Sequence, residues 1–557
     1  MESYPLLGKP MAMDGVLDYR GRPIAKQDSG RWVAASFILV MEMAERVAFN
    51  GIVFNLITYM TGPLGESNAA AASAVTVWSG ASMMLPILGA LVADSFLSRF
   101  RTIVVSSILY VLGLGLLSLS AVLPNRSNCS SEGHETMDYA SCPPTTLRVA
   151  VFYFSLYLVA FAQGGHRPCS QAFGADQFDE TDSEESMWRS SFFNWWIFGL
   201  SLPMIVSPII LSYVQENVNW GIGFGIPCIL MSASFTVFLL GSRFYRCYTL
   251  KETSSYAQIS QLLSTLVRNQ RYSDVKSEAE AQDKHCSESS HQPRLEASGE
   301  HINAGQIEEA KDLLRLFPIW ASCVGYTLVL AQYETFFTKQ GGTLYRKIGS
   351  NFQIPAAGLQ GLNNAAITFI IVIYDRIAVP LARNITGIPS GITMLQRIGT
   401  GLLISIFVMV LSALVEMKRL ETAREFGLVD EPNSVLPMSI LWLFPQYIFL
   451  GLASAISIGG LQEFFYDQMP DSLRSLGVAL CISIFGIGHL INSFLVYVID
   501  KVTISFTGES WFSDNLNRAH LDYFYWLVAG LNVCFFVVFI GFARSYVYKK
   551  KKVIVVI

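Results

Sequence analysis

One charged stretch interrupts the first long apolar run of this chain: Glu42-Met43-Ala44-Glu45-Arg46. The segments on either side, 32–40 and 47–60, are almost free of charge, and the whole run is long enough to cross a bilayer as a helix. A charge at the bilayer centre costs about 2.5 kcal/mol or more, so such residues usually face a water-filled path and mark ion or proton handling. The alternative, a soluble helix with one charged face, fits poorly because many similar apolar runs follow.

The composition is that of a membrane protein. Of the 557 residues, 52% are hydrophobic and only 15% are charged, whereas a soluble chain carries about 25% charged residues. The 37 Phe, 23 Tyr and 10 Trp residues suit lipid-facing helices and the aromatic belts at membrane interfaces. The formal net charge is only −4, so nucleic acid is not an expected partner. The expected partners are the lipid bilayer, protons and a small-molecule substrate.

Apolar runs that are long enough to span recur at fairly even intervals and predict an all-α membrane protein with twelve transmembrane helices. Several exceed the roughly 20 residues that a crossing needs, so tilted or over-length helices are expected. The predicted spans are 32–61, 69–97, 102–124, 147–172, 188–213, 219–242, 310–338, 357–381, 392–415, 436–466, 475–499 and 520–547.

The one long break, 243–309, is rich in Ser, Glu, Lys, Gln and His, and it predicts a largely disordered cytosolic linker. It divides the chain into six-helix bundles at 32–242 and 310–547, flanked by cytosolic tails at 1–31 and 548–557. Lys and Arg cluster near the span ends that this arrangement places inside, although two outer segments carry some as well. Two six-helix halves around a central cavity are one of the transporter architectures built from repeats.

The nine cysteines show no metal-ligand spacing, and neither a metal site nor a cofactor is expected. Cys129 and Cys142 both fall in the predicted outer loop 125–146, on the oxidising side of the membrane. Whether they form a disulfide stays open, because the geometry of a disulfide cannot be read from sequence. No nucleophile–base pair or phosphate-binding loop is visible either, so the sequence does not indicate an enzyme.

Beyond residues 42–46, short polar and aromatic motifs stand along the whole chain: Gly174-Ala175-Asp176-Gln177-Phe178-Asp179, Ser191-Phe192-Phe193-Asn194-Trp195-Trp196, Thr335-Phe336-Phe337-Thr338-Lys339-Gln340, Tyr374-Asp375-Arg376, Leu395-Gln396-Arg397-Ile398-Gly399, Pro445-Gln446-Tyr447, Glu463-Phe464-Phe465-Tyr466-Asp467-Gln468, Asn515-Leu516-Asn517 and His520-Leu521-Asp522-Tyr523-Phe524-Tyr525-Trp526. In kind and order they resemble the proton-dependent oligopeptide transporter family, a branch of the major facilitator superfamily, and more narrowly the plant nitrate/peptide transporters. The resemblance implies the major facilitator fold and proton symport.

The physical chemistry of the first motif can be stated without the family. Glu42, Glu45 and Arg46 lie at i, i+3 and i+4, so they share one helix face. A buried Arg neutralised by carboxylates is tolerable, and a carboxylate that can gain a proton is a natural proton carrier. Its protonation would free the Arg from its partner, which couples a charge change to a conformational switch. A static buried ion network is the alternative.

Gly89, Asp94, Arg99 and Arg101 straddle the second and third spans and resemble the superfamily's inner-loop signature. The resemblance implies a structural gating role for Asp94 and Arg99, not a contact with substrate. The chain departs from the pattern at Ser98, where a Gly is usual before the Arg. A Ser at this position is expected to stiffen the turn and to leave the charges intact.

In relatives, a Lys at the position of Arg167 in the fourth span can pair across the two halves with the tenth-span Glu, which is Glu463 here. In peptide-carrying relatives this Glu also receives the substrate's amino group. Arg stays protonated, so Arg167 could hold Glu463 or an anionic substrate but could not release the proton itself. The alternative for Arg167 is a snorkelling side chain at a helix end, because Pro168 and Asp176 suggest that the inner membrane face is close.

The seventh span carries the clearest clue to the substrate. Nitrate carriers with a defined anion site place a His at the position of Leu330, just before Ala331 and Gln332, so that histidine site is absent. Bacterial peptide-carrying relatives have a Glu at the position of Ala331. Glu334 lies one turn further out on the same helix face, and we expect it to replace that Glu as outer-gate partner of Arg46. The alternative is a solvated Glu at the helix mouth. Gln332 is expected to serve the substrate site or a gate as well.

The first residues contain a motif that is independent of the fold. Glu2 stands four residues before Leu6 and Leu7, which fits an acidic dileucine sorting signal in an exposed tail. The signal resembles those that route plant carriers to the vacuolar membrane, so the vacuole is favoured over the plasma membrane.

Together, these features predict a proton-coupled secondary transporter that moves nitrate, small peptides or small organic metabolites across a membrane by alternating access. A transport-defective receptor or sensor of the same fold is the alternative. The intact charges of the first span argue against it.

Overall fold

A computed structural model describes residues 12–25, 29–92, 97–124, 144–179, 182–248, 304–348, 352–387, 391–432, 434–469 and 474–548 of this chain. Several predictions concern residues outside these ranges. They are the sorting motif Glu2, Leu6 and Leu7, the inner-loop Asp94, the pair Cys129 and Cys142, and most of the central linker.

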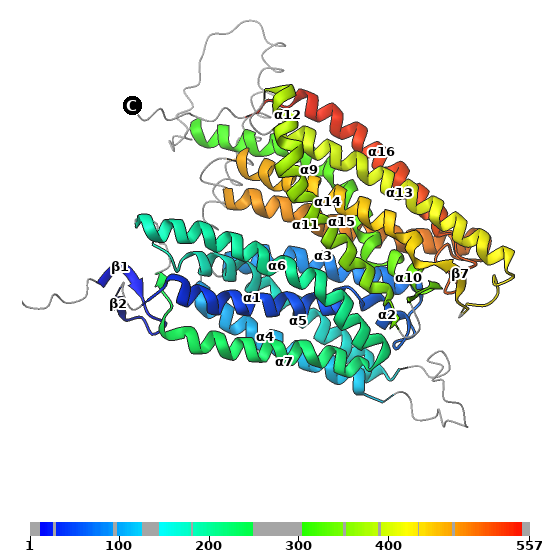
Figure 1. Cartoon of the computed structure of the whole chain (residues 1–557), viewed down its shortest axis with the longest axis horizontal. Helices are drawn as coiled ribbons and strands as arrows, with labels where there is room; N and C mark the ends of the chain where they lie inside the picture. The colour runs from blue at the N-terminus through cyan, green and yellow to red at the C-terminus, as the bar shows by residue number, and fades with distance from the viewer. Residues whose placement is uncertain are drawn as a thin grey trace, which may run out of the picture.

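The described chain folds into two helical halves (Figure 1). The N-terminal half comprises α1 (Arg31–Val53), α2 (Leu56–Thr61), α3 (Asn68–Val92), α4 (Arg99–Val122), α5 (Thr146–Ala175), α6 (Ser183–Asn217), α7 (Trp220–Leu240) and the 3-10 turn η4 (Gly241–Arg243). The C-terminal half comprises α9 (Ala304–Glu334), α10 (Phe336–Gly342), η5 (Ala356–Gly358), α11 (Leu359–Ile373), the π-helical turn η6 (Tyr374–Ala378), α12 (Val379–Thr386), α13 (Met394–Glu425), η7 (Ile440–Leu443), α14 (Phe444–Asp467), α15 (Arg474–Thr507) and α16 (Leu521–Ser545).

Apolar sequence and polar caps together explain where the long helices begin. Asp182 accepts a hydrogen bond from Glu184 N at the start of α6, and Asn219 does the same for Gly221 N at the start of α7. At α13, Thr393 and Gln396 form a reciprocal capping box. Each cap satisfies backbone N–H groups that the first helical turn leaves without partners. These three helices therefore begin directly after their capping residues.

Among the described residues, eleven helical segments are long and apolar enough to cross a membrane. The twelfth predicted span corresponds to α1 and α2, and it falls short of that criterion because Glu42, Glu45 and Arg46 interrupt its apolar run. α1 nevertheless lies beside the other helices of its half (Figure 1). The two-half helical architecture expected from the sequence is confirmed.

Some details differ from the predicted spans. α13 ends at Glu425, whereas the sequence predicted its end at 415, because two buried charges in its last turns neutralise each other. Short strands were not predicted. β1 (Ala12–Leu17) pairs antiparallel with β2 (Pro23–Ala25) and with β3 (Cys247–Tyr248), so the N-terminal segment docks on the start of the linker. β4 (Leu344–Tyr345) and β7 (Leu436–Ser439) are parallel, and β5 (Lys347–Ile348) and β6 (Phe352–Gln353) are antiparallel.

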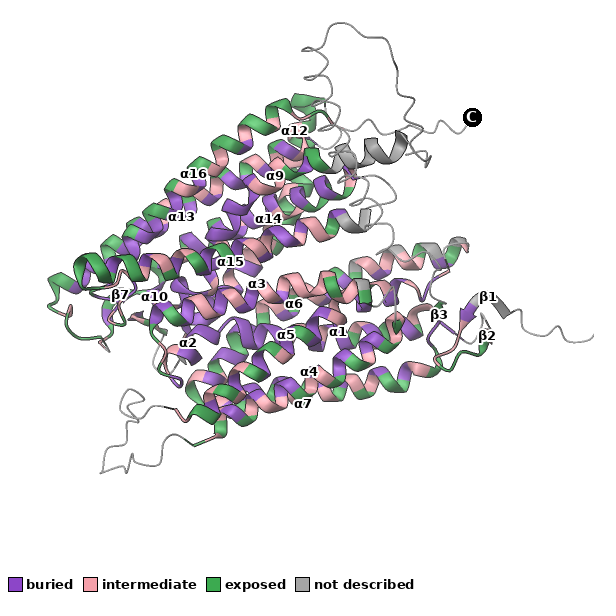
Figure 2. Cartoon of the chain, turned by 180° about the vertical axis from the view of Figure 1, so that it is seen from behind, coloured by how far each residue is buried: buried purple, intermediate pink, exposed green. Residues whose placement is uncertain are grey.

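The two halves meet at the end of the molecule opposite β1 and diverge toward the end that carries β1 (Figures 1 and 2). The sequence predicts that the β1 end faces the cytosol, so the two ends are called the outer and the inner end. Among the described residues, hydrogen bonds and an ion pair cross between the halves at the outer end. They join Lys339 Nζ to Thr61, Asn68 N to Asp514, Arg346 to Glu216, Ser73 to Ser493, Gln360 to the Phe54 carbonyl and Asn364 to the Met204 carbonyl, at 2.6 to 3.1 Å.

α3 and α15 form the crossing between the halves. A Cβ atom on Gly80 of α3 would lie only 2.8 Å from the Gly486 carbonyl oxygen of α15. A Cβ on Gly486 would in turn lie 2.7 Å from two atoms of Met84. Because only glycine leaves room for this approach, these two positions hold the helices at their point of closest contact.

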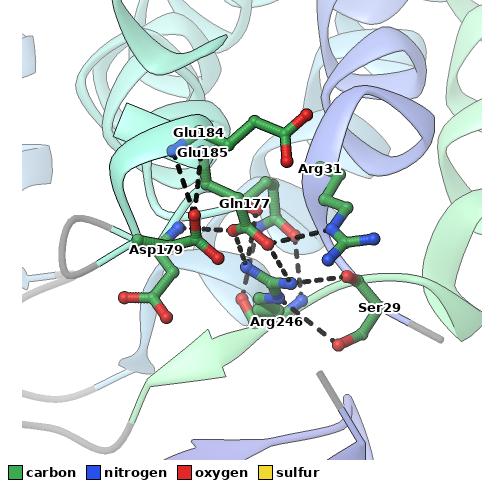
Figure 3. A network of polar contacts seen from close by, with 8 residues as sticks. Ser29, Arg31, Gln177, Asp179, Glu184, Glu185 and Arg246 are labelled. Atoms are coloured by element: carbon green, nitrogen blue, oxygen red, sulfur yellow. Dashed lines mark hydrogen bonds and ion pairs between the residues drawn. The ribbon is translucent and has the colours of Figure 1, made fainter. Parts of the chain in front are cut away.

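A buried polar network fixes the inner end of α1 inside the N-terminal half (Figure 3). The Arg246 guanidinium, which is fully buried, donates to Glu185 Oε2 at 2.7 Å, to the Gln177 carbonyl at 3.1 Å and to the Ser29 carbonyl at 2.8 Å. Arg31 Nε donates to Glu185 Oε1 at 2.9 Å. Burial alone would raise the pKa of Glu185, but hydrogen bonds from Arg246 and Arg31 outweigh it and lower the pKa. The network ties the start of α1 to α6, to the residues that follow α5 and to the residue that precedes β3.

Candidate functional site

The charges of α1 form the centre of a buried cluster. Arg46 donates to Glu42 Oε1 through Nη2 at 3.0 Å and through Nε at 3.2 Å. Its Nε also lies 3.6 Å from Glu45 Oε2. The exposed fraction is 1% for Glu42 and 0% for Glu45, so both carboxylates are removed from solvent in this structure. The i, i+3, i+4 spacing therefore places all three residues on one interior face, as predicted from the sequence.

α5 completes the cluster with a second guanidinium. Arg167 Nε lies 3.8 Å from Glu45 Oε1, and the guanidinium carbon lies 4.5 Å from the centre of the Phe49 ring. Gln163 lies one turn earlier in α5. With its side-chain amide oxygen oriented toward Arg167, it accepts hydrogen bonds from all three guanidinium nitrogens at 2.7 to 3.2 Å. Two carboxylates are thus balanced by two guanidinium groups, and a cation–π contact with Phe49 supports one of them.

His166 and Tyr110 line the same cluster, and the sequence had given no reason to include them. His166 Nδ1 lies 3.7 Å from Glu42 Oε2, and Tyr110 of α4 donates to Glu45 Oε1 at 3.2 Å. Oε2 of each carboxylate is buried and makes no hydrogen bond among the described residues. An acceptor oxygen that is buried without a donor is costly, and a proton on that oxygen would relieve the cost.

Arg167 and Glu463, predicted to pair across the halves, have other partners in this structure. Arg167 contacts Glu45 of its own half, and Glu463 Oε2 lies 3.5 Å from Arg397 Nη1 of α13. Arg397 also lies over the Tyr374 ring, with 4.7 Å from guanidinium carbon to ring centre. The halves are apart at this end, which explains why the pair is not formed. The snorkelling alternative for Arg167 does not hold, because its guanidinium points into the cluster.

Contrary to the prediction, Glu334 does not contact Arg46. Its Oε2 accepts from Ser79 of α3 at 2.7 Å and lies 3.5 Å from His489 Nε2 of α15. Arg46 is already paired within α1, which leaves the outer carboxylate to these partners. Gln332 is fully buried and donates to Asn492 at 2.8 Å, so it belongs to the packing of α9 on α15. The solvated alternative for Glu334 is also not what the structure shows, since its side chain is only 13% exposed.

Of the two gating residues predicted from the inner-loop signature, the structure describes Arg99. Its Nη1 lies 2.5 Å from Asp176 Oδ2, at the end of α5. Ser98, which replaces the usual Gly, has φ +63° and ψ +150°. This conformation is essentially restricted to glycine, so the turn is strained as well as stiff.

Besides His166 and Tyr110, three more side chains of the site were not predicted from the sequence: Ser79, Arg397 and His489. Arg397 stood in one of the quoted motifs, but its partner Glu463 lies on a different helix. His489 and Ser79 looked isolated because their partner is far away along the chain. Within the described ranges, no group of three or more His, Cys, Asp or Glu side chains could hold a metal ion.

Comparison with known proteins identifies the family. The model of the PTR2, or POT, family matches residues 100–512. The chain belongs to the POT family. Protein NRT1/PTR FAMILY 5.10 from Arabidopsis thaliana is 48% identical over 542 residues, which cover 96% of each chain. Protein NRT1/PTR FAMILY 5.14 from the same plant is 47% identical over 547 residues, again covering 96% of each chain.

Solved POT structures share the fold. The structure of an auto inhibited POT family peptide transporter has a TM-score of 0.69 at 19% identity and covers 93% of this chain and 98% of that chain. A second POT family transporter, solved in meso, has a TM-score of 0.70 at 18% identity and covers 92% and 98%. The chain is therefore a multi-pass membrane transporter of the major facilitator type and not an enzyme.

Proposed function

We propose that this POT family chain is a proton-coupled secondary transporter and that the cluster on α1 and α5 carries the coupling. The observation that supports it is the burial of Glu42 and Glu45 beside Arg46 and Arg167, with one oxygen of each carboxylate left without a hydrogen-bond donor. Four charges at this depth are expensive to maintain, and such residues in membrane helices usually have functional roles.

Glu45 is the better of the two carboxylates for linking a proton to substrate. It contacts both guanidinium groups, at 3.6 Å for Arg46 and 3.8 Å for Arg167. A proton on Glu45 would weaken its hold on Arg167. Because the guanidinium stays charged, it would then bind another anion. That anion is a negative group of the substrate in one state and Glu463 in another.

In an alternating-access cycle, the Arg167–Glu463 pair would form in the state in which the inner end is closed. In the present state the halves meet at the outer end, and Arg397 holds Glu463 at the inner end. We infer that closing the inner end brings Glu463 to Arg167, so that each charge neutralises the other. Substrate or a proton arriving at Glu463 would weaken that pair and favour reopening. Asp94, which lies between α3 and α4 in the sequence, and Arg99, the first residue of α4, are proposed to support the same inner closure.

The proposed cargo is nitrate, a small peptide or a small organic metabolite. The relatives named above are NRT1/PTR proteins, and one solved POT family transporter, with a TM-score of 0.64, was in complex with 5-aminolevulinic acid. The charged groups described near the inner end have both signs, with Arg167 on one half and Arg397 beside Glu463 on the other. Leu330 stands where the histidine nitrate site would be, which counts against nitrate binding by that route.

The vacuolar membrane is the proposed location, on the strength of Glu2, Leu6 and Leu7 alone. A fluorescent fusion should reside on the vacuolar membrane, and Leu6→Ala combined with Leu7→Ala should redirect it to another membrane. Residence of the unmodified fusion at the plasma membrane would show that the signal is not read.

Uptake by proteoliposomes under an imposed pH gradient tests the coupling. A panel of nitrate, dipeptides and small organic acids and amines is offered to the unmodified chain and to Glu42→Gln, Glu45→Gln and Arg46→Ala. Glu421→Gln, an exposed carboxylate on α13, is the matched control. The three cluster variants should lose gradient-driven accumulation, whereas the control should accumulate normally. Size-exclusion profiles check folding, because removing one partner of a buried ion pair can cost about 3–5 kcal/mol.

Accumulation that is undiminished in all three well-folded cluster variants would refute the proton-carrier assignment. A folded chain that binds a member of the panel but never accumulates it would favour the receptor or sensor instead.

A further inference from the structure

The structure assigns a second proton-binding site to Glu334 and His489, at the seam between the halves and apart from the α1 cluster. The inference rests on the proposed proton-coupled transport and adds a site to it. Glu334 ends α9, His489 lies within α15, and Ser79 approaches from α3 of the other half. Both side chains are removed from solvent, with His489 3% and Glu334 13% exposed.

The hydrogen bond at Nδ1 fixes the tautomer of His489. Nδ1 lies 2.7 Å from the Phe485 carbonyl oxygen. A carbonyl can only accept, so Nδ1 must carry the hydrogen. In a neutral imidazole the other nitrogen, Nε2, is then a bare acceptor.

That bare nitrogen faces another acceptor. Nε2 lies 3.5 Å from Glu334 Oε2, and among the described residues it makes no hydrogen bond. Two lone pairs buried face to face repel each other unless a proton lies between them. One proton, carried as an imidazolium or as a carboxylic acid, turns this contact into a charge-assisted hydrogen bond. The geometry therefore fits a site that holds one shared proton.

Among the described residues, the only ion pair that involves Glu334 or His489 is the one between them. α3 has no charged residue in its sequence and presents Ser79, while α9 itself presents the Tyr333 phenol, which lies against Tyr447 of α14. On the other helices packed against α9, the buried or half-buried charges Lys339, Glu416, Glu463 and Asp522 contact Thr61, Arg419, Arg397 and His520, respectively.

Ser79 connects the proton to the closure of the outer end. Its hydroxyl donates to Glu334 Oε2 at 2.7 Å, across the boundary between the halves. Further outward on α3, Ser73 contacts Ser493 of α15, also across the halves, at 2.6 Å. With the proton present, Glu334 is held by both α15 and α3. Without it, repulsion between Oε2 and Nε2 displaces the carboxylate and loosens its bond to α3. A proton that enters from the outer side would therefore favour outer closure.

Glutamine substitutions mimic the loaded site. In His489→Gln the side-chain amide N–H can donate to Glu334 at any pH. In Glu334→Gln the amide N–H can donate to His489 Nε2 at any pH. Both variants should keep the outer end closed where the unmodified chain opens. His489→Leu, which cannot donate at all, should open at any pH. Arg346→Gln is the control, because it breaks a cross-half ion pair at the outer end without touching this site.

Double electron–electron resonance measures the outer opening directly. Spin labels are placed at Asn217 on α6 and Glu425 on α13, both exposed at the outer ends of their helices. The full chain is held in nanodiscs without substrate or gradient, with reactive cysteines replaced by serine. Raising the pH from about 5 to about 9 should increase the ratio of open to closed outer end about tenfold in the unmodified chain. Both glutamine variants should show no such increase, and Arg346→Gln should be shifted toward open at every pH with the pH response retained.

The proposal is overturned if the unmodified chain shows no pH response, or if either glutamine variant responds as the unmodified chain does. It is also overturned if the response vanishes in Glu45→Gln but persists in His489→Gln, because the titrating site would then be the α1 cluster. The spin-label experiment measures no transport. Its result therefore does not depend on the outcome of the uptake experiment on Glu42 and Glu45.

Discussion

The outer and inner ends of the molecule hold their polar residues together in different ways. At the outer end, contacts such as Lys339 with Thr61 and Arg346 with Glu216 run from one half to the other. At the inner end, the described networks run within one half, as in Arg246 with Glu185 and Arg397 with Glu463. The outer contacts therefore hold the halves together in this state, whereas the inner contacts keep each half rigid while the halves are apart.

This difference assigns different consequences to substitutions at the two ends. A change at the outer end should alter the balance between states as well as stability. A change in an inner network such as Arg246 with Glu185 should alter stability alone, because both partners move together with their half. Glu463 is the exception, because it is also the proposed partner of Arg167 when the inner end closes. Alternating access requires such a division, since the bonds of one end must break while each half stays intact.

The largest effect is expected from the buried pair that supports the outer end. Arg419 and Glu416, both fully buried, are 2.7 Å apart, and Arg419 also donates to the Leu516 carbonyl at 2.6 Å. Leu516 lies in the segment between α15 and α16. The same segment contains Asp514, which accepts a hydrogen bond from Asn68 N of the other half. Arg419→Met leaves Glu416 buried without its partner, which should lower the free energy of unfolding by about 3–5 kcal/mol. Thermal unfolding in detergent measures the change.

The same helix supplies the control for that substitution. Lys418 and Glu421 form an ion pair with the same i, i+3 spacing at 2.7 Å, but both side chains are exposed. Lys418→Met should leave the unfolding temperature unchanged, because exposed pairs are screened by water. Equal losses in the two variants would mean that burial does not set the importance of the α13 pairs.

A smaller effect is expected at the crossing of α3 and α15, where neither end dominates. Gly80→Ala puts a methyl group 2.8 Å from the Gly486 carbonyl oxygen, and backbone cannot move away cheaply. We expect a loss of about 1–3 kcal/mol, typical of an overpacked contact. Gly530→Ala on α16, which meets nothing within 4 Å, should be neutral or slightly stabilising. A harmless Gly80→Ala would show that the helices do not approach this closely.

The stability contributed by the inner network around Glu185 should depend on pH. Because folding lowers the pKa of Glu185, the folded chain favours the ionised carboxylate. Its stabilising contribution is complete above the ordinary Glu pKa of about 4.3 and is lost as the pH falls through the lower folded value. Unfolding temperatures between pH 7 and the acid limit should fall less steeply in Glu185→Gln than in the unmodified chain. Glu184→Gln, an exposed neighbour, should retain the full slope. Parallel curves for Glu185→Gln and the unmodified chain would contradict the role of this network.

The smallest effect is expected at the inner turn before α4. Ser98→Gly removes a side chain from a backbone with φ +63° and ψ +150°. Relief of that strain should stabilise the chain by about 1 kcal/mol, after the entropy cost of a glycine in the unfolded state. Ser98→Ala retains a Cβ atom and should bring no gain. A gain of the same size from alanine would point to the hydroxyl group and not to the backbone.

Local spacing explains most of what the sequence could predict. Apolar runs gave the spans, and the i, i+3, i+4 pattern placed Glu42, Glu45 and Arg46 on one face, which the structure bears out. The unusual Ser98 was visible as a departure from a glycine pattern, and its φ is indeed positive. Each of these features depends on residues that are close along the chain.

Long-range partners could not be predicted in the same way. The partner of Glu463 in this state is Arg397 and not Arg167, because the choice depends on which end is closed. The hydropathy pattern ended the ninth span at 415, since it counts Glu416 and Arg419 as loop charges, although they neutralise each other inside α13. His489 belongs to no motif, and its partner Glu334 lies on a different helix far away along the chain.

One measurement tests alternating access most directly: double electron–electron resonance on an inner and an outer label pair, each introduced into the full chain. Both distances are measured at each pH and with each member of the substrate panel. The inner pair joins Glu184 on α6 with Asn384 on α12, and the outer pair joins Asn217 with Glu425, all four exposed. The inner distance should shorten whenever the outer distance lengthens. Arg167→Lys should keep the inner-closed population and Glu463→Gln should lose it. Inner and outer distances that change in the same direction, or an inner closure unaffected by Glu463→Gln, would contradict the proposed mechanism.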